Sequence, residues 1–285
     1  MNDLKKLILD YCGQLERLNY SKNTIRTYKT AYTEFIVYFK EKDITQITYD
    51  EILAYLTKRA NDDKISSSYQ NQLINAIKFY YEIMLGQEKK FYYLKRPFKE
   101  EKLPPILSVQ EIGKLLSVIT NLKHKAIICV IYSCGLRISE LINLRFTDVD
   151  RNRMVVNIRQ GKGKKDRVVN LEQDTLDALT NYYKSLKIKP KEYFFGGQSK
   201  TKETYSVGSI QSFLRRYCIM AKVKVVSPHK LRHSYGTHLR DLGVDLAIIQ
   251  DMMGHDSPKS TRIYAKLSNN RINNLPKLIK NATSN

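Results

Sequence analysis

A basic segment that contains three prolines divides this chain of 285 residues into two parts. The segment spans residues 87–106, reads QEKKFYYLKRPFKEEKLPPI, and shows neither a helical nor a strand period. The adjacent Pro104 and Pro105 exclude a helix, because proline lacks an N–H and fixes its own backbone angle. The sequence therefore predicts a stiff linker between two domains. The chain is also long enough for a sizeable hydrophobic core.

The first part, residues 1–86, has the hydrophobic pattern of amphipathic helices. Apolar residues recur at three- and four-residue steps in SKNTIRTYKTAYTEFIVYFKE and in SSSYQNQLINAIKFYYEIML. Thr48 and Glu51 have the spacing of a capping box that starts another helix. Together with the amphipathic N-terminus, these patterns predict a small bundle of four helices.

The second part, residues 107–268, is predicted to be helical apart from one hairpin. Ser108 and Glu111 form a second capping box, and a helical run follows that includes AIICVIYSCGLRISELINL. Residues 154–159 and 167–171 have strand character and flank a glycine-containing basic turn at 160–165, which predicts a β-hairpin. Ser227 followed by Pro228 predicts a helix start. The expected fold class is therefore mostly α with a small β-hairpin or sheet in the second domain, and residues 269–285 form a C-terminal tail.

The charge of the chain indicates a polyanionic partner. The net charge is +21, and residues 101–285 carry +17 of it. A proteome-wide lysine bias would not divide so unevenly, so a basic surface that binds nucleic acid is the better explanation. No apolar run approaches the ~20 residues of a membrane span. The four cysteines show no CxxC spacing, which favours reduced thiols in a cytoplasmic protein without a zinc knuckle.

Two basic motifs of the second part carry residue types suited to phosphate chemistry. Arg137 lies in GLRISEL near an expected helix start, with Glu140 three residues on and able to orient the guanidinium. Lys162 lies between two glycines in GKGKKDR, where a bare backbone can enter a DNA groove. Alone, Arg137 is better explained as a surface salt bridge and Lys162 as part of a solvated charge run. Lys164 and Lys165 compete for any role given to Lys162.

The stretch SPHKLRHSYGTH gathers three of the five histidines, at positions 229, 233 and 238, around Arg232. On a helix that starts near 228, His229 and Arg232 share a face, with His233 one position round. His229 and His233 have the spacing of a zinc HExxH helix, but Lys230 replaces its glutamate and no third ligand is evident. Packing is therefore the simpler explanation for His233 and His238.

The last motif is MGHDSPKSTRIYAKL. Asp245 is expected to cap a helix that Gly254 ends, with His255 in the following turn. Tyr264 follows nine residues later. With 20 tyrosines in the chain, composition alone would assign Tyr264 to packing.

Taken in order, these motifs resemble the signature of the tyrosine recombinases, the site-specific DNA recombinases that include Xer proteins and phage or transposon integrases. The resemblance extends over nearly the whole chain. It implies a helical core-binding (SAM-like) domain at 1–86 and a catalytic domain at 107–268, which together form a clamp around DNA. It also implies that the six signature positions are catalytic: Arg137, Lys162, His229, Arg232, His255 and Tyr264.

The resemblance implies a covalent mechanism without a cofactor. Tyr264 would attack a phosphodiester to give a 3′-phosphotyrosyl link and a free 5′-hydroxyl, which conserves the bond energy, so neither ATP nor a metal would be required. Arg137, Arg232 and His255 would stabilise the phosphoryl oxygens. Lys162 would protonate the leaving oxygen and His229 would accept the tyrosine proton, with Glu140 and His233 in supporting roles.

The implied partner is double-stranded DNA with inverted half-sites, bound by a homo-tetramer, or a hetero-tetramer with a related recombinase, on two duplexes. The tail would dock on a neighbouring protomer, although Pro276 interrupts any helix there and a frayed tail is the simpler expectation. Two other functions stay open at this point: a type IB topoisomerase, which would relax supercoils, and a non-catalytic DNA-binding relative. Within the recombinases, an Xer-type role in dimer resolution is slightly favoured over a mobile-element integrase or invertase.

Overall fold

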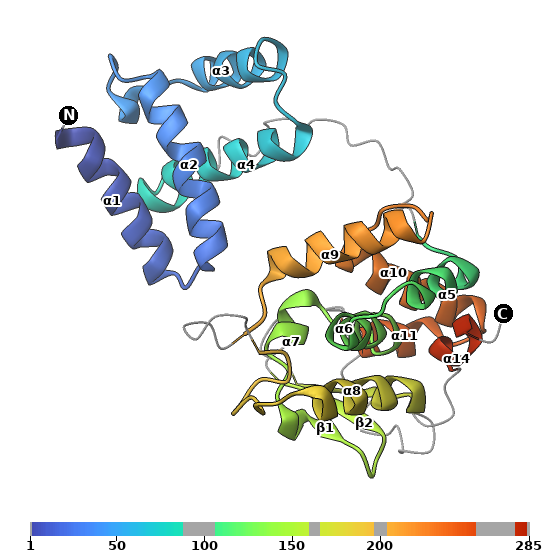
Figure 1. The fold of residues 1–285 in the computed structure, drawn as a ribbon. Coiled ribbons are helices and arrows are strands. Elements are labelled where there is room, and N and C mark those ends of the chain that lie inside the picture. Colours follow the sequence, from blue (N-terminus) through green and yellow to red (C-terminus); the bar gives the residue numbers. More distant parts are fainter. Residues whose placement is uncertain (1, 88–105, 160–165, 197–203, 255–276, 284–285) are drawn as a thin grey trace. The chain divides into compact units, whose positions relative to one another are not determined.

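The computed structural model describes residues 2–87, 106–159, 166–196, 204–254 and 277–283, which fall into two compact units, residues 1–102 and 103–285. The first unit is a helical bundle (Figure 1). Its helices are α1 (Asn2–Arg17), α2 (Lys22–Tyr38), α3 (Tyr49–Asn61) and α4 (Ser67–Lys78), joined by a short 3-10 turn, η1 (Ile44–Gln46), and followed by a π-helical turn, η2 (Phe79–Met84). The four predicted helices are confirmed.

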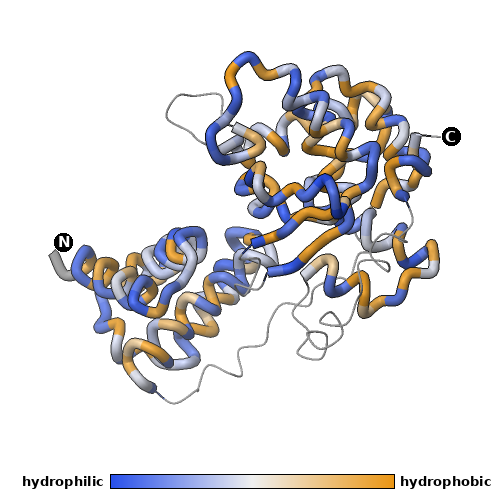
Figure 2. The backbone as a smooth tube through the Cα atoms, turned by 90° about the horizontal axis from the view of Figure 1, so that it is seen from below, coloured by the Kyte–Doolittle hydropathy of each residue, from blue (hydrophilic) through white to orange (hydrophobic). Residues whose placement is uncertain are grey.

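Aromatic residues form much of the core of this bundle. The rings of Tyr11 and Tyr32 stack with centroids 4.0 Å apart, and the Tyr11 hydroxyl donates to the carbonyl of Ala76 at 3.0 Å. Hydrophobic and hydrophilic residues alternate along these helices (Figure 2), and the core of the bundle contains buried residues from all four of them. The capping box of Thr48 and Glu51 is present at the start of α3, as predicted.

The second unit is built around the helix α6 (Leu122–Ser133), in which every residue from Ala126 to Ser133 is buried. The described helices around it are α5 (Val109–Ser117), α7 (Ile138–Ile142), α8 (Gln173–Ser185), α9 (Val207–Met220), α10 (Pro228–Asp241), α11 (Leu246–Met252) and α14 (Leu278–Thr283) (Figure 1). The predicted caps at Ser108, Ser227 and Asp245 are confirmed.

The expected helical run through residues 126–144 consists of two helices, α6 and α7, and the helix start expected near Arg137 is confirmed. Gly135 lies between them with φ +60°, a left-handed conformation that ends α6 and redirects the chain. A Cβ at this position would lie 2.5 Å from the ring of Tyr235, so the α10 side chain packs directly on the glycine backbone. The break leaves Arg137 as the N-cap residue of α7.

A three-stranded antiparallel sheet, β1–β2–β3, covers one side of this unit. The strands are β1 (Val149–Asp150), β2 (Val155–Ile158) and β3 (Arg167–Asn170), and Ile158 pairs with Arg167 at the end nearest the turn. The predicted hairpin is confirmed, but the sequence pattern missed β1. Met154 has φ +53°, which excludes it from the strand in which it was expected.

The end of the tail, residues 277–283, is folded rather than frayed. Leu278, Ile279 and Ala282 of α14 are buried against α5, α6 and α8 (Figure 1). The Glu172 carboxylate accepts hydrogen bonds from the backbone N–H groups of Leu278 and Ile279, at 2.8 and 2.9 Å. In the described part of the chain, no helix has the length and apolar character needed to cross a membrane.

Gly135→Ala should lower the free energy of unfolding by about 3 kcal/mol, because alanine is strained at positive φ and its methyl group would overlap the Tyr235 ring. Urea denaturation of the full chain measures this. Gly208→Ala, in α9, is the matched control, since a Cβ there meets only the Ser206 hydroxyl at 3.7 Å. Equal stability of the two variants would contradict the assignment of Gly135 as a close-packing position.

Candidate active site

Arg137 is positioned by the helix that it starts. Its backbone N–H donates to Oε2 of Glu140 at 2.8 Å, and its Nη1 donates to Oε1 of the same carboxylate at 2.8 Å. Glu140 thus caps the first turn of α7 and orients the guanidinium of the residue before it. The three-residue spacing of the two residues is what makes both contacts available.

Glu140 is the centre of a cluster of three arginines. Besides Arg137, its carboxylate accepts two parallel hydrogen bonds from Arg167, at 2.8 and 2.7 Å, and lies 3.6 Å from Nη1 of Arg232. Burial opposes its ionisation, but the hydrogen bonds and positive charges of Arg167 and Arg137 outweigh it and lower the pKa of Glu140 to about 2. The carboxylate therefore stays charged, and three cations surround one anion.

The C-terminal end of α11 binds the same three guanidinium groups. Arg167 donates through Nε to the carbonyl of Met252 at 2.8 Å, Arg232 donates to the carbonyl of Met253, and Arg137 donates to the carbonyl of Gly254. Consecutive carbonyls at a helix end have no partners within the helix and carry its negative dipole, which suits them to cations.

Gly254 has little space around its Cα. Its φ is +61°, and a Cβ would lie 3.2 to 3.3 Å from the guanidinium Nη1 atoms of Arg167 and Arg137. A larger residue would therefore be strained in its backbone and crowded against both guanidinium groups.

Arg232 retains an unused hydrogen-bond donor. Its side chain is 3% exposed, and its Nη1 is buried without a hydrogen-bond partner among the described residues. Burial, with the neighbouring charge of Arg137, lowers the pKa of Arg232 to about 10, so it remains charged at neutral pH. An anionic oxygen is the ligand that this buried donor and its surplus positive charge would favour.

The histidines of α10 separate into two groups. His229 and His233 lie on the surface side with their Nε2 atoms 3.2 Å apart. Burial, followed by His233, Arg232 and Arg137, lowers the pKa of His229, which leaves its ring neutral at pH 7. His238 is buried, with Nδ1 2.9 Å from the hydroxyl of Tyr132, and belongs to the core. Among the described residues, no three His, Cys, Asp or Glu side chains are grouped to hold a metal ion.

Tyr235 lies on α10, three residues after Arg232. It is 1% exposed, packs on Gly135, and has its hydroxyl 3.9 Å from the sulfur of Met252. This position suits a packing residue beneath the arginine cluster.

The structure brings together Arg137, Glu140 and Arg232, with His229 and His233 on the same helix as Arg232. Lys162, Lys164, Lys165, His255 and Tyr264 lie outside the described residues. Arg167 is the contributor that the sequence pattern missed. In the sequence, Arg167 is only the first residue of the second strand of the hairpin. No neighbouring residue indicates that its side chain contacts α7 and α11.

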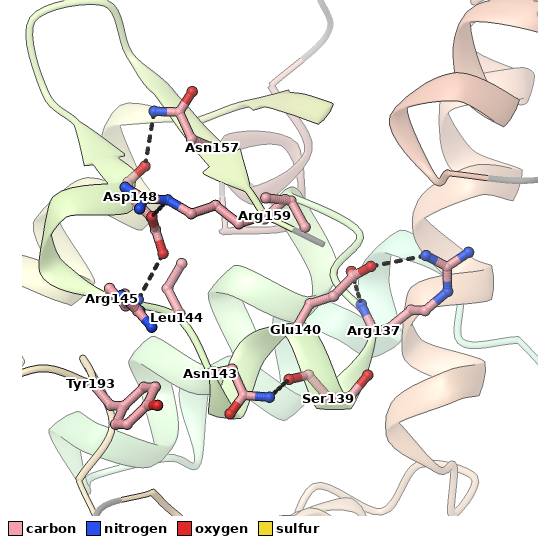
Figure 3. Close-up of a pocket in the computed structure, with 11 residues that line it drawn as sticks. Arg137, Ser139, Glu140, Asn143, Leu144, Arg145, Asp148, Asn157, Arg159 and Tyr193 are labelled. Atoms are coloured by element: carbon pink, nitrogen blue, oxygen red, sulfur yellow. Dashed lines mark hydrogen bonds and ion pairs between the residues drawn. The ribbon is translucent and has the colours of Figure 1, made fainter. Parts of the chain in front are cut away.

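A cavity of about 720 Å³ adjoins the cluster (Figure 3). Arg137 and Glu140 lie at one end of it, pointing toward one another, and Arg159 bonds Asp148 at the other, with Nε 2.8 Å from the carboxylate. Among the described residues, three arginines line the cavity, and each already pairs with a carboxylate: Arg137 with Glu140, Arg145 with Glu192 and Arg159 with Asp148. The surplus of positive charge is therefore concentrated at the Glu140 cluster.

Two family models match the chain. The phage integrase family matches residues 105–271, and the N-terminal SAM-like domain of phage integrases matches residues 7–90. The tyrosine recombinase XerA of Pyrococcus furiosus is 32% identical over 265 residues, which cover 92% of this chain and 90% of that protein. The tyrosine recombinase XerC of Leptospira interrogans is 28% identical and covers 95% and 91% of the two chains.

Solved structures show the same fold. The crystal structure of XerA recombinase has a TM-score of 0.50 and 28% identity, covering 93% of this chain and 94% of that one. The site-specific recombinase XerH, bound to its difH substrate before cleavage, has a TM-score of 0.66 and 21% identity, covering 89% and 81%. The predicted arrangement of an N-terminal SAM-like domain and a mostly helical catalytic domain with a small sheet is confirmed.

Because the pKa of Glu140 is lowered on folding, its charge stabilises the fold above the pKa of the unfolded chain, and this contribution disappears as the pH falls toward 2. Between pH 6 and pH 3, the wild-type chain should therefore lose about 2 kcal/mol more unfolding free energy than Glu140→Gln. Urea titrations at each pH measure this. Glu41→Gln removes an exposed carboxylate and should follow the wild type. Parallel pH curves for wild type and Glu140→Gln would contradict the assigned pKa.

Proposed function

This chain belongs to the phage integrase family and is a tyrosine recombinase, and we propose that it cuts and rejoins DNA through a covalent bond between Tyr264 and a 3′-phosphate. The proposed catalytic residues are Arg137, Lys162, His229, Arg232, His255 and Tyr264. The observation that carries the proposal is the convergence of Arg137 and Arg232 on Glu140 and on the end of α11, directly before His255.

The arginine cluster suits the hardest part of the reaction, which is the extra negative charge on a five-coordinate phosphorus. Arg137 and Arg232 each keep guanidinium N–H groups beyond those bound to carbonyls and Glu140, and the buried Nη1 of Arg232 gains a partner when a phosphate oxygen binds. Their positions are fixed before substrate arrives, so little reorganisation is needed when charge develops. His255 follows Gly254, whose carbonyl is bound to Arg137, and would add a further donor.

The proton transfers follow from the same residues. The Tyr264 oxygen forms a bond to phosphorus as the bond to the 5′-oxygen breaks. His229 would take the tyrosine proton, for which its lowered pKa and neutral ring suit it. Lys162 would give a proton to the departing 5′-oxygen, with Lys164 and Lys165 as the alternative donors. The 5′-hydroxyl of a second strand then reverses the step and releases Tyr264.

The proposed partner is double-stranded DNA with inverted half-sites, held by four protomers of this chain or of this chain and a related recombinase. The +17 charge of residues 101–285 supports DNA binding, as does the determination of the related XerH fold on DNA. In such an assembly, the C-terminal tail would dock on a neighbour, where α14 would make the contacts with Glu172, α5 and α6 that it makes here within its own chain.

The proposed cellular role is Xer-type dimer resolution, slightly favoured over integration or inversion of a mobile element; the similarity to XerA and XerC proteins is consistent with it. Covalently trapped strands mapped on genomic DNA test this. A single chromosomal or plasmid site supports resolution, whereas the ends of an element support integration.

Tyr264→Phe should keep DNA affinity but abolish the SDS-resistant protein–DNA adduct, because only the nucleophilic oxygen is removed. A suicide substrate nicked next to the cleavage point traps the adduct for measurement on a denaturing gel. Tyr235→Phe is the matched control and should still form the adduct, since Tyr235 is a buried packing residue. An adduct from Tyr264→Phe would place the nucleophile elsewhere.

Adduct formation should be unchanged by EDTA. The guanidinium groups of Arg137 and Arg232 supply the positive charge that Mg²⁺ supplies in many nucleases. The rate of adduct formation on the suicide substrate is measured once with EDTA and once with MgCl₂, each at about 10 mM. The two rates should agree within about twofold. Loss of the adduct on chelation would overturn the proposed role of the arginines.

A further inference from the structure

Arg167 is an arginine of the cluster that the proposed mechanism does not use. It begins β3, its side chain is 11% exposed, and it makes three hydrogen bonds of 2.7 to 2.8 Å. Two of them bind both oxygens of Glu140 in parallel, and the third binds the carbonyl of Met252. A planar, bidentate pair of this kind is the strongest and most directional ion pair available to a side chain.

The first consequence is electrostatic. Without Arg167, the Glu140 carboxylate would face only Arg137 and Arg232, the two residues proposed to bind the phosphate. Its charge would then compete with the phosphate for them, since a buried anion interacts strongly with any cation in reach. With both oxygens bound by Arg167, the carboxylate can orient Arg137 while its charge is largely balanced by a cation that takes no part in the reaction.

The second consequence is mechanical. Arg167 joins three segments that carry proposed catalytic residues. Its backbone lies in the strand β3, which follows the segment containing Lys162 in the sequence, and its bidentate pair reaches the first turn of α7 after Arg137. Its Nε reaches the carbonyl of Met252 in the last turn of α11, three positions before His255 in the sequence. Since these segments come from distant parts of the sequence, one side chain that contacts all of them limits their relative movement.

We propose that Arg167 is a positioning residue of the recombination site: it balances the charge of Glu140 and fixes the hairpin, α7 and α11 relative to one another. This inference rests on the proposed function of Arg137 and Arg232. It assigns no contact between Arg167 and DNA.

The test measures two quantities for each full-length variant: the affinity for the DNA site, and the single-turnover rate of adduct formation on the nicked suicide substrate at saturating protein. Arg167→Lys keeps the positive charge but loses the planar guanidinium that makes the bidentate pair. It should slow adduct formation at least tenfold, while the DNA affinity stays within threefold of wild type. Arg59→Lys is the matched control. Arg59 also pairs with two carboxylates, Glu34 and Asp63, but in the other unit, and its variant should react at the wild-type rate.

The readout that separates charge balance from simple structural support is a double-mutant cycle with Glu140. Arg167→Met leaves the buried carboxylate unbalanced and should slow adduct formation more than tenfold. Adding Glu140→Gln removes that charge, so the double variant should react at least fivefold faster than Arg167→Met alone. If Arg167→Met does not fold, Arg167→Gln compared with Arg167→Gln/Glu140→Gln carries the same comparison, since glutamine also removes the positive charge.

Three outcomes would overturn the inference. A wild-type rate of adduct formation for Arg167→Lys would show that the bidentate guanidinium pair is not needed for the reaction. A loss of DNA affinity that accounts for the whole loss of rate would make Arg167 a DNA contact. A double variant slower than Arg167→Met would make the two residues independent structural supports. Wild type and Tyr264→Phe are run alongside, because absence of an adduct from the wild type would instead overturn the proposed function.

Discussion

The buried carboxylate of Glu140 is the interaction on which the site depends. Three guanidinium groups would repel one another if they were brought together alone. The carboxylate, together with the three consecutive carbonyls at the end of α11, supplies the negative charge that lets them assemble. Because three cations share one full negative charge, the assembled cluster keeps a net positive charge, which suits a phosphate.

The rest of the second unit holds the segments of this cluster in place. The buried helix α6 forms the centre of the hydrophobic core, and the left-handed Gly135 turns the chain so that α7 starts at Arg137. The ring of Tyr235, packed on Gly135, fixes α10 against that turn, and Arg232 lies on the same helix three residues earlier. The same contact that shapes the core thus also sets the distance between the two arginines of the site.

Much of this could be predicted locally. The caps at Thr48, Ser108 and Ser227, the hairpin, and the pairing of Arg137 with Glu140 depend on residues that lie within a few positions of one another, and the structure contains each of them. Errors arose where a backbone conformation depends on surroundings. Met154 has a positive φ that excludes it from the strand in which it was expected, and the side chain of Arg167 contacts α7 and α11, which no local pattern indicated. The domain boundaries and the six catalytic residues stay predictions, with Lys162, His255 and Tyr264 outside the described residues.

By itself, the sequence determined the mostly helical class, the hairpin, and the order of the residues suited to phosphoryl transfer, because helical periods, caps and motif spacings are short-range properties of the chain. Only the tertiary structure decided which charged groups meet. The contacts of Arg167 with Glu140 and Met252 join residues 27 and 85 positions apart, and no local pattern encodes them. They exist because the hairpin, α7 and α11 pack around one core, where a largely buried arginine is stable only if folding places acceptors within its reach.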